Sequence, residues 1–159
     1  MEIERKLQTL DLTLPAALEP PAGTKLPFPW VRIDGDRLFV SGHAPLAADG
    51  RLATPRGKVG RDLNLEQGYE AARLTALAIL ASIQREIGDL DQIAAWLRAF
   101  GMVNVADGFN QMPSVINGFS DLIIELYGPD RGAHARSAVG MAALPFDIPV
   151  EIEAEVRLK

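Results

Sequence analysis

Charged residues near the C-terminal end of the chain are of the types that bind anions and move protons. Arg136 opens a strand-like segment, and its planar guanidinium matches the two oxygens of a carboxylate. Glu151, Glu153 and Glu155 alternate with apolar residues, so they share one face of a strand. A glutamate that loses contact with water has a raised pKa and serves as an acid or base near neutrality. The alternative for each residue is an ordinary solvated side chain.

These residues fall in two predicted strands that close the chain. Strict alternation over residues 150–158 predicts a strand with one buried face. Residues 135–143 are also strand-like, and small residues on the Arg136 side leave room for something to pack there. If the two strands form an antiparallel pair that turns near Phe146, Glu151 is level with Ala142. Arg136 is then about 20 Å away, and the two charges would meet only across a subunit boundary.

The remaining elements predict an α+β fold, a mostly antiparallel sheet with two long helices on one face. Asn64 and Gln67 form a capping-box pattern at the start of the first long helix. Gly101 indicates a bulge or a close approach within a strand. In order, we expect a helix over 3–10, a hairpin of strands over 28–33 and 37–42, a helix over 64–87, a strand over 96–105, a helix from Pro113 to Gly128 and the two closing strands.

Length and composition are those of one globular domain. The 159 residues are expected to form an N-terminal helix and extended arm (residues 1–26) and a single body (residues 27–159). The net charge of −5 and the lack of a basic stripe make nucleic acid an improbable partner. The absence of cysteine excludes disulfides and a thiolate nucleophile. Without a signal peptide or a long apolar run, we expect a cytoplasmic protein with no membrane segment.

Histidine, serine and asparagine supply the remaining candidates. His43 and His134 are the only histidines, and a metal site would need carboxylates converging on them. We expect both to be partly exposed loop residues, although His43 could donate to a ligand. Ser41 has no nucleophile motif around it. Asn117 falls inside a predicted helix, where asparagine is unfavourable, so its position needs an explanation.

Three short segments close the chain at a characteristic spacing: Ala135-Arg136-Ser137, Leu144-Pro145 and Val150-Glu151-Ile152-Glu153. They resemble, with matching spacing, the closing signature of the Rid (reactive intermediate deaminase) family, which is also called YjgF-like or L-PSP endoribonuclease-like. Ser41-Gly42-His43-Ala44-Pro45 is similar to its Ser-Gly-Gln-x-Pro segment, with His43 in place of glutamine. Val115-Ile116-Asn117 is similar to its Val-x-Asn. The resemblance covers most of the chain and indicates a divergent branch.

The resemblance implies a chorismate-mutase-like fold and a homotrimer with clefts between subunits. It implies hydrolysis of reactive imines or enamines to 2-oxo acids and ammonia, with no metal or organic cofactor. Arg136 would hold the carboxylate of a small metabolite, and Glu151 would orient or activate water. Ser41, Gly42 and Asn117 would line the pocket.

Two departures from the family pattern keep other functions open. Phe28 stands where the family has a tyrosine, and Ala138 stands where it has a cysteine. The pocket is therefore expected to be more apolar than usual. The alternatives are a non-catalytic protein that binds a small carboxylate and, from the older family name, an endoribonuclease, against which the acidic composition counts.

Overall fold

The computed structural model describes all of residues 1–159 as one five-stranded mixed sheet with helices. Its elements are α1 (Glu2–Thr9), β1 (Val31–Asp34), β2 (Arg37–His43), α2 (Leu65–Ile87), β3 (Ile93–Asn104), α3 (Met112–Gly132), β4 (Ala135–Met141) and β5 (Val150–Leu158), with short 3₁₀ turns at Leu90–Gln92 and Pro145–Asp147. The sheet order is β1-β2-β5-β3-β4, and only the β3–β4 pair is parallel.

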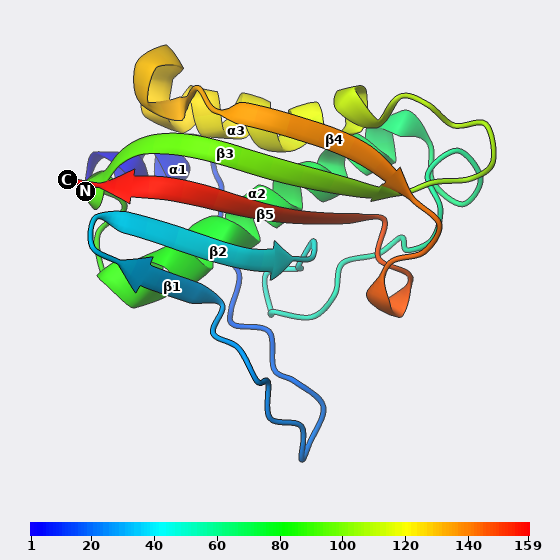
Figure 1. Cartoon of the computed structure of the whole chain (residues 1–159), viewed down its shortest axis with the longest axis horizontal. Helices are drawn as coiled ribbons and strands as arrows, with labels where there is room; N and C mark the ends of the chain where they lie inside the picture. Colours follow the sequence, from blue (N-terminus) through cyan, green and yellow to red (C-terminus); the bar gives the residue numbers. More distant parts are fainter.

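Both long helices cover the same face of the sheet, as Figure 1 shows behind the strands. In β5, Val150, Ile152 and Val156 are fully buried in the core, whereas Glu151 and Glu153 point to the other face, which no helix covers. This arrangement confirms the predicted α+β fold with two long helices on one face. None of the helices is both long and apolar enough to cross a bilayer.

The first two strands form the predicted hairpin, with a later start than expected. Gly35 closes the turn at φ 61°, a left-handed conformation that glycine adopts without strain. The first strand begins at Val31 rather than at Phe28. Pro27 and Pro29 flank Phe28 and have no N–H for the strand ladder, so pairing starts only beyond them.

The first long helix, α2, begins and ends as its sequence predicts. The Asn64 side-chain oxygen accepts a 2.8 Å hydrogen bond from the Gln67 N–H, and the Gln67 side chain accepts one of 2.9 Å from the Asn64 N–H. Gly88 follows the last turn at φ 80°. Ala72 and Ala76 are fully buried, so the small side chains of α2 face the core.

Helix α3 lies close against the sheet and is longer than expected. Pro113 occupies its first turn, as predicted. Gly128 ends the regular helix at φ 79°, as predicted, and a further short helical stretch beyond this kink extends α3 to Gly132. A Cβ at Gly101 would lie 2.6 Å from the Ile116 side chain. Gly101 therefore permits the close approach of α3 to β3 that the sequence indicated.

The two closing strands are not neighbours, because β3 lies between them. Arg136 of β4 pairs with Ala99 of β3, and Glu151 of β5 pairs with Met102 of the same strand. The expected hairpin around Phe146 is therefore wrong: the segment between β4 and β5 crosses the end of β3. Alternation of side chains shows that a segment is a strand but does not identify its neighbour.

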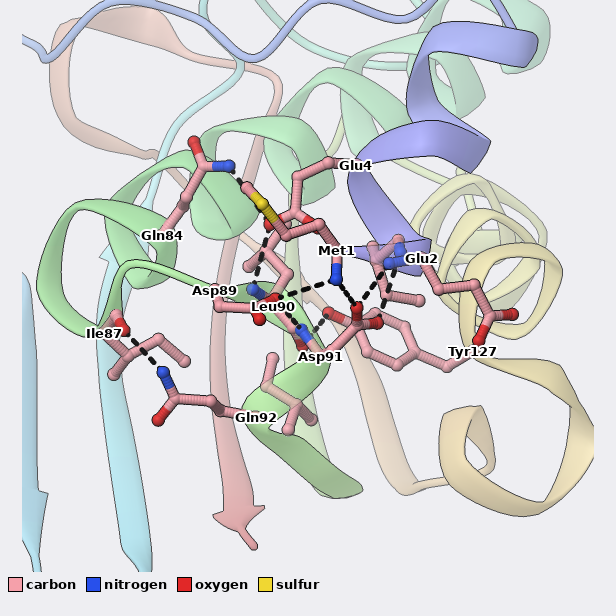
Figure 2. Close-up of polar contacts among 12 residues, drawn as sticks. Met1, Glu2, Glu4, Gln84, Ile87, Asp89, Leu90, Asp91, Gln92 and Tyr127 are labelled. Carbon is pink, nitrogen blue, oxygen red and sulfur yellow. Dashed lines mark hydrogen bonds and ion pairs between the residues drawn. The ribbon is translucent and has the colours of Figure 1, made fainter.

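Helix α1 is fastened to the body by charged groups at its first turn (Figure 2). The Asp91 carboxylate accepts a 3.2 Å hydrogen bond from the Ile3 N–H and pairs with the amino group of Met1. Glu4 reaches the other way and accepts a 3.0 Å bond from the Leu90 N–H. A carboxylate at a helix N-terminus satisfies free amides and complements the helix dipole. The apolar side of α1 belongs to the same core as the sheet.

Candidate functional site

Arg136 lies near the start of the edge strand β4, and its side chain turns toward α3. Nη1 donates to Asn117 Oδ1 at 2.8 Å and to Ser120 Oγ at 3.0 Å, and Nη2 donates to the Pro113 carbonyl at 3.4 Å. Asn117 is thus explained: an asparagine inside the helix supplies an acceptor for the guanidinium. Ala138 follows on the same face of β4 and packs against the core.

The guanidinium of Arg136 keeps free donors after these contacts. An arginine has five N–H donors, and the three bonds to α3 leave Nε–H and one N–H of Nη2 without a partner in the chain. No carboxylate lies within ion-pair distance of Arg136. The side chain is partly exposed. An arginine fixed by neutral acceptors, with two adjacent donors open, is suited to bind an anion.

Ser120 is a site residue that no sequence motif marks. Its hydroxyl lies between Arg136 Nη1 and His134 Nε2, which is 2.9 Å away. The signal that could have found it is helical spacing, because residues three apart, such as Asn117 and Ser120, share one helix face. His134 lies in the loop between α3 and β4 and is partly exposed, as expected, and its ring meets that of Phe119 edge-on at a centroid distance of 5.6 Å.

Glu151 lies on the open face of the sheet, beside the backbone of β2. A Cβ at Gly42 would lie 2.7 Å from Glu151 Oε2, so the glycine leaves the space that the carboxylate occupies. Glu151 is half-buried and has no hydrogen-bond partner in the chain. Burial raises the pKa of Glu151, and the negative charge of Glu153 raises it further. A desolvated carboxylate with a raised pKa is suited to accept and return a proton near neutrality.

The open face also carries a shallow hollow beyond Glu151. Its volume is about 140 Å³, and it lies over β2, β3 and β5. Arg37 pairs with Glu155 at 3.1 Å at its margin. Phe39 is 37% exposed there. The hollow is lined by Phe39, Val40, Arg98, Phe100, Glu153, Ala154 and Glu155.

His43 is buried, so the expectation of a partly exposed loop histidine is wrong. Its Nδ1 donates to the Ser41 carbonyl at 2.6 Å, and its Nε2 lies 2.8 Å from Ser82 Oγ. The ring packs against Trp30 at a centroid distance of 5.1 Å. Burial lowers the pKa of His43 to about 4, and the charge of Arg85 adds to this effect. A neutral ring with both nitrogens engaged inside the protein does not face Glu151 or Arg136.

Ser41 lies near the end of β2, and Phe28 lies just before β1. The Ser41 hydroxyl donates to the Pro29 carbonyl at 2.8 Å, which connects β2 to the segment before β1 (residues 27–30). Phe28 is 46% exposed, and its ring meets Trp30 edge-on at 5.7 Å. Phe28 therefore presents an apolar surface without a polar tip.

The site residues fall into two groups within one chain. Arg136, Asn117 and Ala138 lie on the helix-covered side at the β4 edge, whereas Gly42 and Glu151 lie on the open face near β2. The backbone of the sheet separates the guanidinium from the glutamate. One group can bind an anion, and the other can move a proton, but a single chain does not bring them together.

Comparisons with known proteins agree with this fold over nearly the whole chain. Residues 6–151 match the family model described as "YjgF/chorismate mutase-like, putative endoribonuclease". The chain is 36% identical over 156 residues to Protein TCP17 of Trypanosoma cruzi, covering 98% of this chain and 94% of that protein.

Two solved structures are similar in both sequence and shape. The protein Atu1372 from Agrobacterium tumefaciens is 39% identical, with a TM-score of 0.86, over 99% of this chain and 92% of that one. A "putative endoribonuclease" from Shewanella oneidensis is 26% identical, with a TM-score of 0.88, over 99% of this chain and 100% of that one. The resemblance inferred from the short motifs and the chorismate-mutase-like fold are confirmed. The chain belongs to the YjgF/chorismate mutase-like family.

Proposed function

We propose that this protein hydrolyses reactive 2-imino acids, or their enamine tautomers, to 2-oxo acids and ammonia. The observation that carries the proposal is the set of hydrogen bonds that Arg136 makes and the donors that it leaves free. Arg136 is held against α3 by Asn117 and Ser120, has no carboxylate partner and keeps two adjacent donors open. A 2-imino acid has a carboxylate beside its C=N carbon, so binding the carboxylate would place that carbon at a fixed distance from the guanidinium.

Glu151 is the proposed proton-transfer group. It would accept a proton from water as the oxygen attacks the carbon of the protonated imine, which gives a neutral carbinolamine. It would then give this proton to the amino nitrogen, ammonia would leave, and the carboxylate would take up the hydroxyl proton as the C=O bond forms. That proton passes to the released ammonia, so the products are a 2-oxo acid and an ammonium ion. One water is consumed, and no cofactor is needed for the balance. The raised pKa of Glu151 favours both steps near neutrality.

The active unit is proposed to be a homo-oligomer, and by family resemblance a homotrimer. Arg136 and Glu151 face opposite sides of the sheet in one chain. The open face has no helix over it and exposes Phe39. A second copy on this face would bury the apolar surface and could bring its own Arg136 toward Glu151.

Ser41, Gly42, His43, Phe28 and Ala138 complete the proposed site in different ways. Gly42 leaves room for the Glu151 carboxylate. His43 donates a hydrogen bond to the Ser41 carbonyl from the buried side of the strand. Phe28 would offer an apolar wall. Ala138 would leave more space than a larger side chain, which suits an apolar substituent on the substrate.

The test uses a coupled assay in which an amino-acid oxidase makes the imine in situ. The expected result is faster ammonia release with this protein present than with the oxidase alone, and loss of this acceleration in Arg136→Ala. If 2-oxo acids bind to Arg136 but the protein does not accelerate release, the protein is a carboxylate-binding protein and not a deaminase.

An endoribonuclease is the second candidate, because the matching family description names that activity. The net charge of −5 disfavours RNA binding, and His43 is buried away from Glu151 and Arg136. Cleavage of a labelled RNA that decreases in Arg136→Ala or Glu151→Gln would support this candidate over the deaminase.

A further inference from the structure

The chain contains two hydrogen-bonded series of arginine, serine and histidine with the same order. In the first, Arg136 Nη1 donates to Ser120 Oγ at 3.0 Å, and Ser120 Oγ lies 2.9 Å from His134 Nε2. In the second, Arg85 Nη2 donates to Ser82 Oγ at 3.1 Å, and Ser82 Oγ lies 2.8 Å from His43 Nε2. The first series starts from the proposed ligand-binding arginine. The second lies against the extended arm (residues 1–26), where Arg85 Nη1 donates to the Pro15 carbonyl at 3.3 Å.

Hydrogen-bond directions in the first series are set by a backbone carbonyl. His134 Nδ1 lies 2.7 Å from the Gly132 carbonyl, which can only accept, so Nδ1 carries the proton. In the neutral ring Nε2 is then an acceptor, and the Ser120 O–H donates to it. The Ser120 lone pairs are left to face Arg136 Nη1. Burial lowers the pKa of His134, and the charge of Arg136 lowers it further, which favours the neutral ring.

This order fixes which donors of Arg136 remain free. Ser120 and Asn117 take both N–H groups of Nη1, because Asn117 Oδ1 accepts the other at 2.8 Å. Nε–H and one N–H of Nη2 remain, on adjacent nitrogens of one plane. Their spacing matches the two oxygens of a single carboxylate.

We infer that Ser120 and His134 are positioning residues: they orient Arg136 so that its Nε and Nη2 donors engage the carboxylate of a 2-oxo or 2-imino acid. The inference rests on the proposed function and goes beyond it, because it assigns roles to Ser120, which contacts the arginine, and to His134, which contacts Ser120. Without the Ser120 acceptor, the Arg136 guanidinium would rotate as Nη1 bonds to other partners. Its free Nε and Nη2 donors would then no longer point in a fixed direction.

The second series provides a matched control inside the same protein. Ser82 is buried like Ser120, and Ser82→Ala removes the same hydroxyl from the same arrangement of arginine and histidine. It does not touch Arg136 or Glu151. A loss that comes only from general destabilisation should therefore appear in both variants, whereas a loss of arginine orientation should appear only in Ser120→Ala.

The experiment is a calorimetric titration of the oligomer with pyruvate and with its neutral amide, pyruvamide. Ser120→Ala is expected to weaken pyruvate binding about tenfold, the usual effect of losing one hydrogen bond to a charged group. His134→Ala, which removes the acceptor of the Ser120 O–H, should weaken it in the same direction. Pyruvamide affinity should stay the same, and Ser82→Ala should bind both ligands like the parent. In the imine assay, KM should rise in Ser120→Ala with a smaller change in kcat.

Two outcomes would overturn the inference, and they are distinguishable. If Arg136→Ala loses pyruvate binding but Ser120→Ala and His134→Ala match Ser82→Ala, the positioning role is wrong and the proposed function stands. If Arg136→Ala binds pyruvate as tightly as the parent, the carboxylate-binding function itself is wrong, and the positioning role fails with it.

Discussion

Arg136 and Glu151 lie on opposite faces of one sheet, in strands β4 and β5 that are separated by β3. Their partners on β3, Ala99 and Met102, are three residues apart. The guanidinium is held by α3, and the carboxylate lies beside Gly42 of β2. A ligand that contacts both groups would have to lie between two copies of the chain, which is the basis of the predictions below.

Removing the guanidinium should abolish recognition of the carboxylate. A charge-assisted, two-point contact contributes roughly 2–3 kcal/mol, so Arg136→Ala should lower kcat/KM for 2-iminopropanoate by about two orders of magnitude. Arg136→Lys should recover only part of this loss, because an ammonium is a point charge without the planar pair of donors. Steady-state kinetics of the two variants test this. Equal rates for Arg136→Ala and the parent would contradict it.

Glu151 should control the acid side of the pH–rate profile. Its pKa is raised by burial and by Glu153. The carboxylate form is the base, so the rate should fall as pH drops through a value above the 4.5 of an ordinary glutamate. Glu153→Gln, which removes the second cause, should move this limb to lower pH. Glu151→Gln should leave pyruvate binding unchanged and eliminate turnover, and an active Glu151→Gln would refute the role.

Gly42 should matter for activity more than for stability. A Cβ at this position would meet the far end of the flexible Glu151 side chain at 2.7 Å, which can move aside at small cost. We expect Gly42→Ala to unfold within a few degrees of the parent and to lose at least tenfold in kcat. Gly101→Ala is the contrasting variant, because its Cβ would meet the buried Ile116 at 2.6 Å and should destabilise the fold by about 1–3 kcal/mol. A fully active Gly42→Ala would contradict the placement of Glu151.

Buried His43 should make the protein acid-sensitive. Its pKa falls from 6.5 to about 4 on folding, so the unfolded chain binds more protons between these values. The stability contribution is present above pH 6.5 and is lost as pH falls toward 4, up to roughly 3 kcal/mol. Arg85 is the charge that faces this ring, and Ser41, Ser82 and Trp30 complete its surroundings.

The measurement for His43 is urea unfolding at several pH values. The parent should lose stability on acidification more steeply than His43→Gln, which has no titrating ring at this position. Because His134 also titrates with a lowered pKa, the difference between the two proteins is the quantity to compare. Parallel pH dependences would show that His43 does not contribute.

Much of the fold follows from local patterns in the sequence. The capping box at Asn64 and Gln67, the glycine stop at Gly88 and the turn at Gly35 each fix an element end through a local hydrogen bond or a backbone conformation. Such signals act over a few residues, so the sequence reveals them. The order of strands depends on contacts between distant segments. Local sequence patterns therefore do not show that β3 lies between β4 and β5.

The sequence likewise predicts some residues of the candidate site and not others. Arg136, Asn117 and Glu151 stand out because charged or polar residues occupy positions with regular spacing. Ser120 and His134 do not, since their importance lies in hydrogen bonds that only the packing of α3 against β4 creates. The burial of His43 is not evident from the sequence, because its neighbours Trp30 and Ser82 come from other parts of the chain.

The most direct test of the shared site is complementation between two inactive variants. Arg136→Ala and Glu151→Gln chains are unfolded together and refolded as mixed oligomers. If each site takes its arginine and its glutamate from different chains, random mixing of a ring-shaped oligomer restores about a quarter of the sites, and the account predicts deaminase activity in that proportion. Activity that stays at the level of the separate variants, although mixed oligomers have formed, would contradict it.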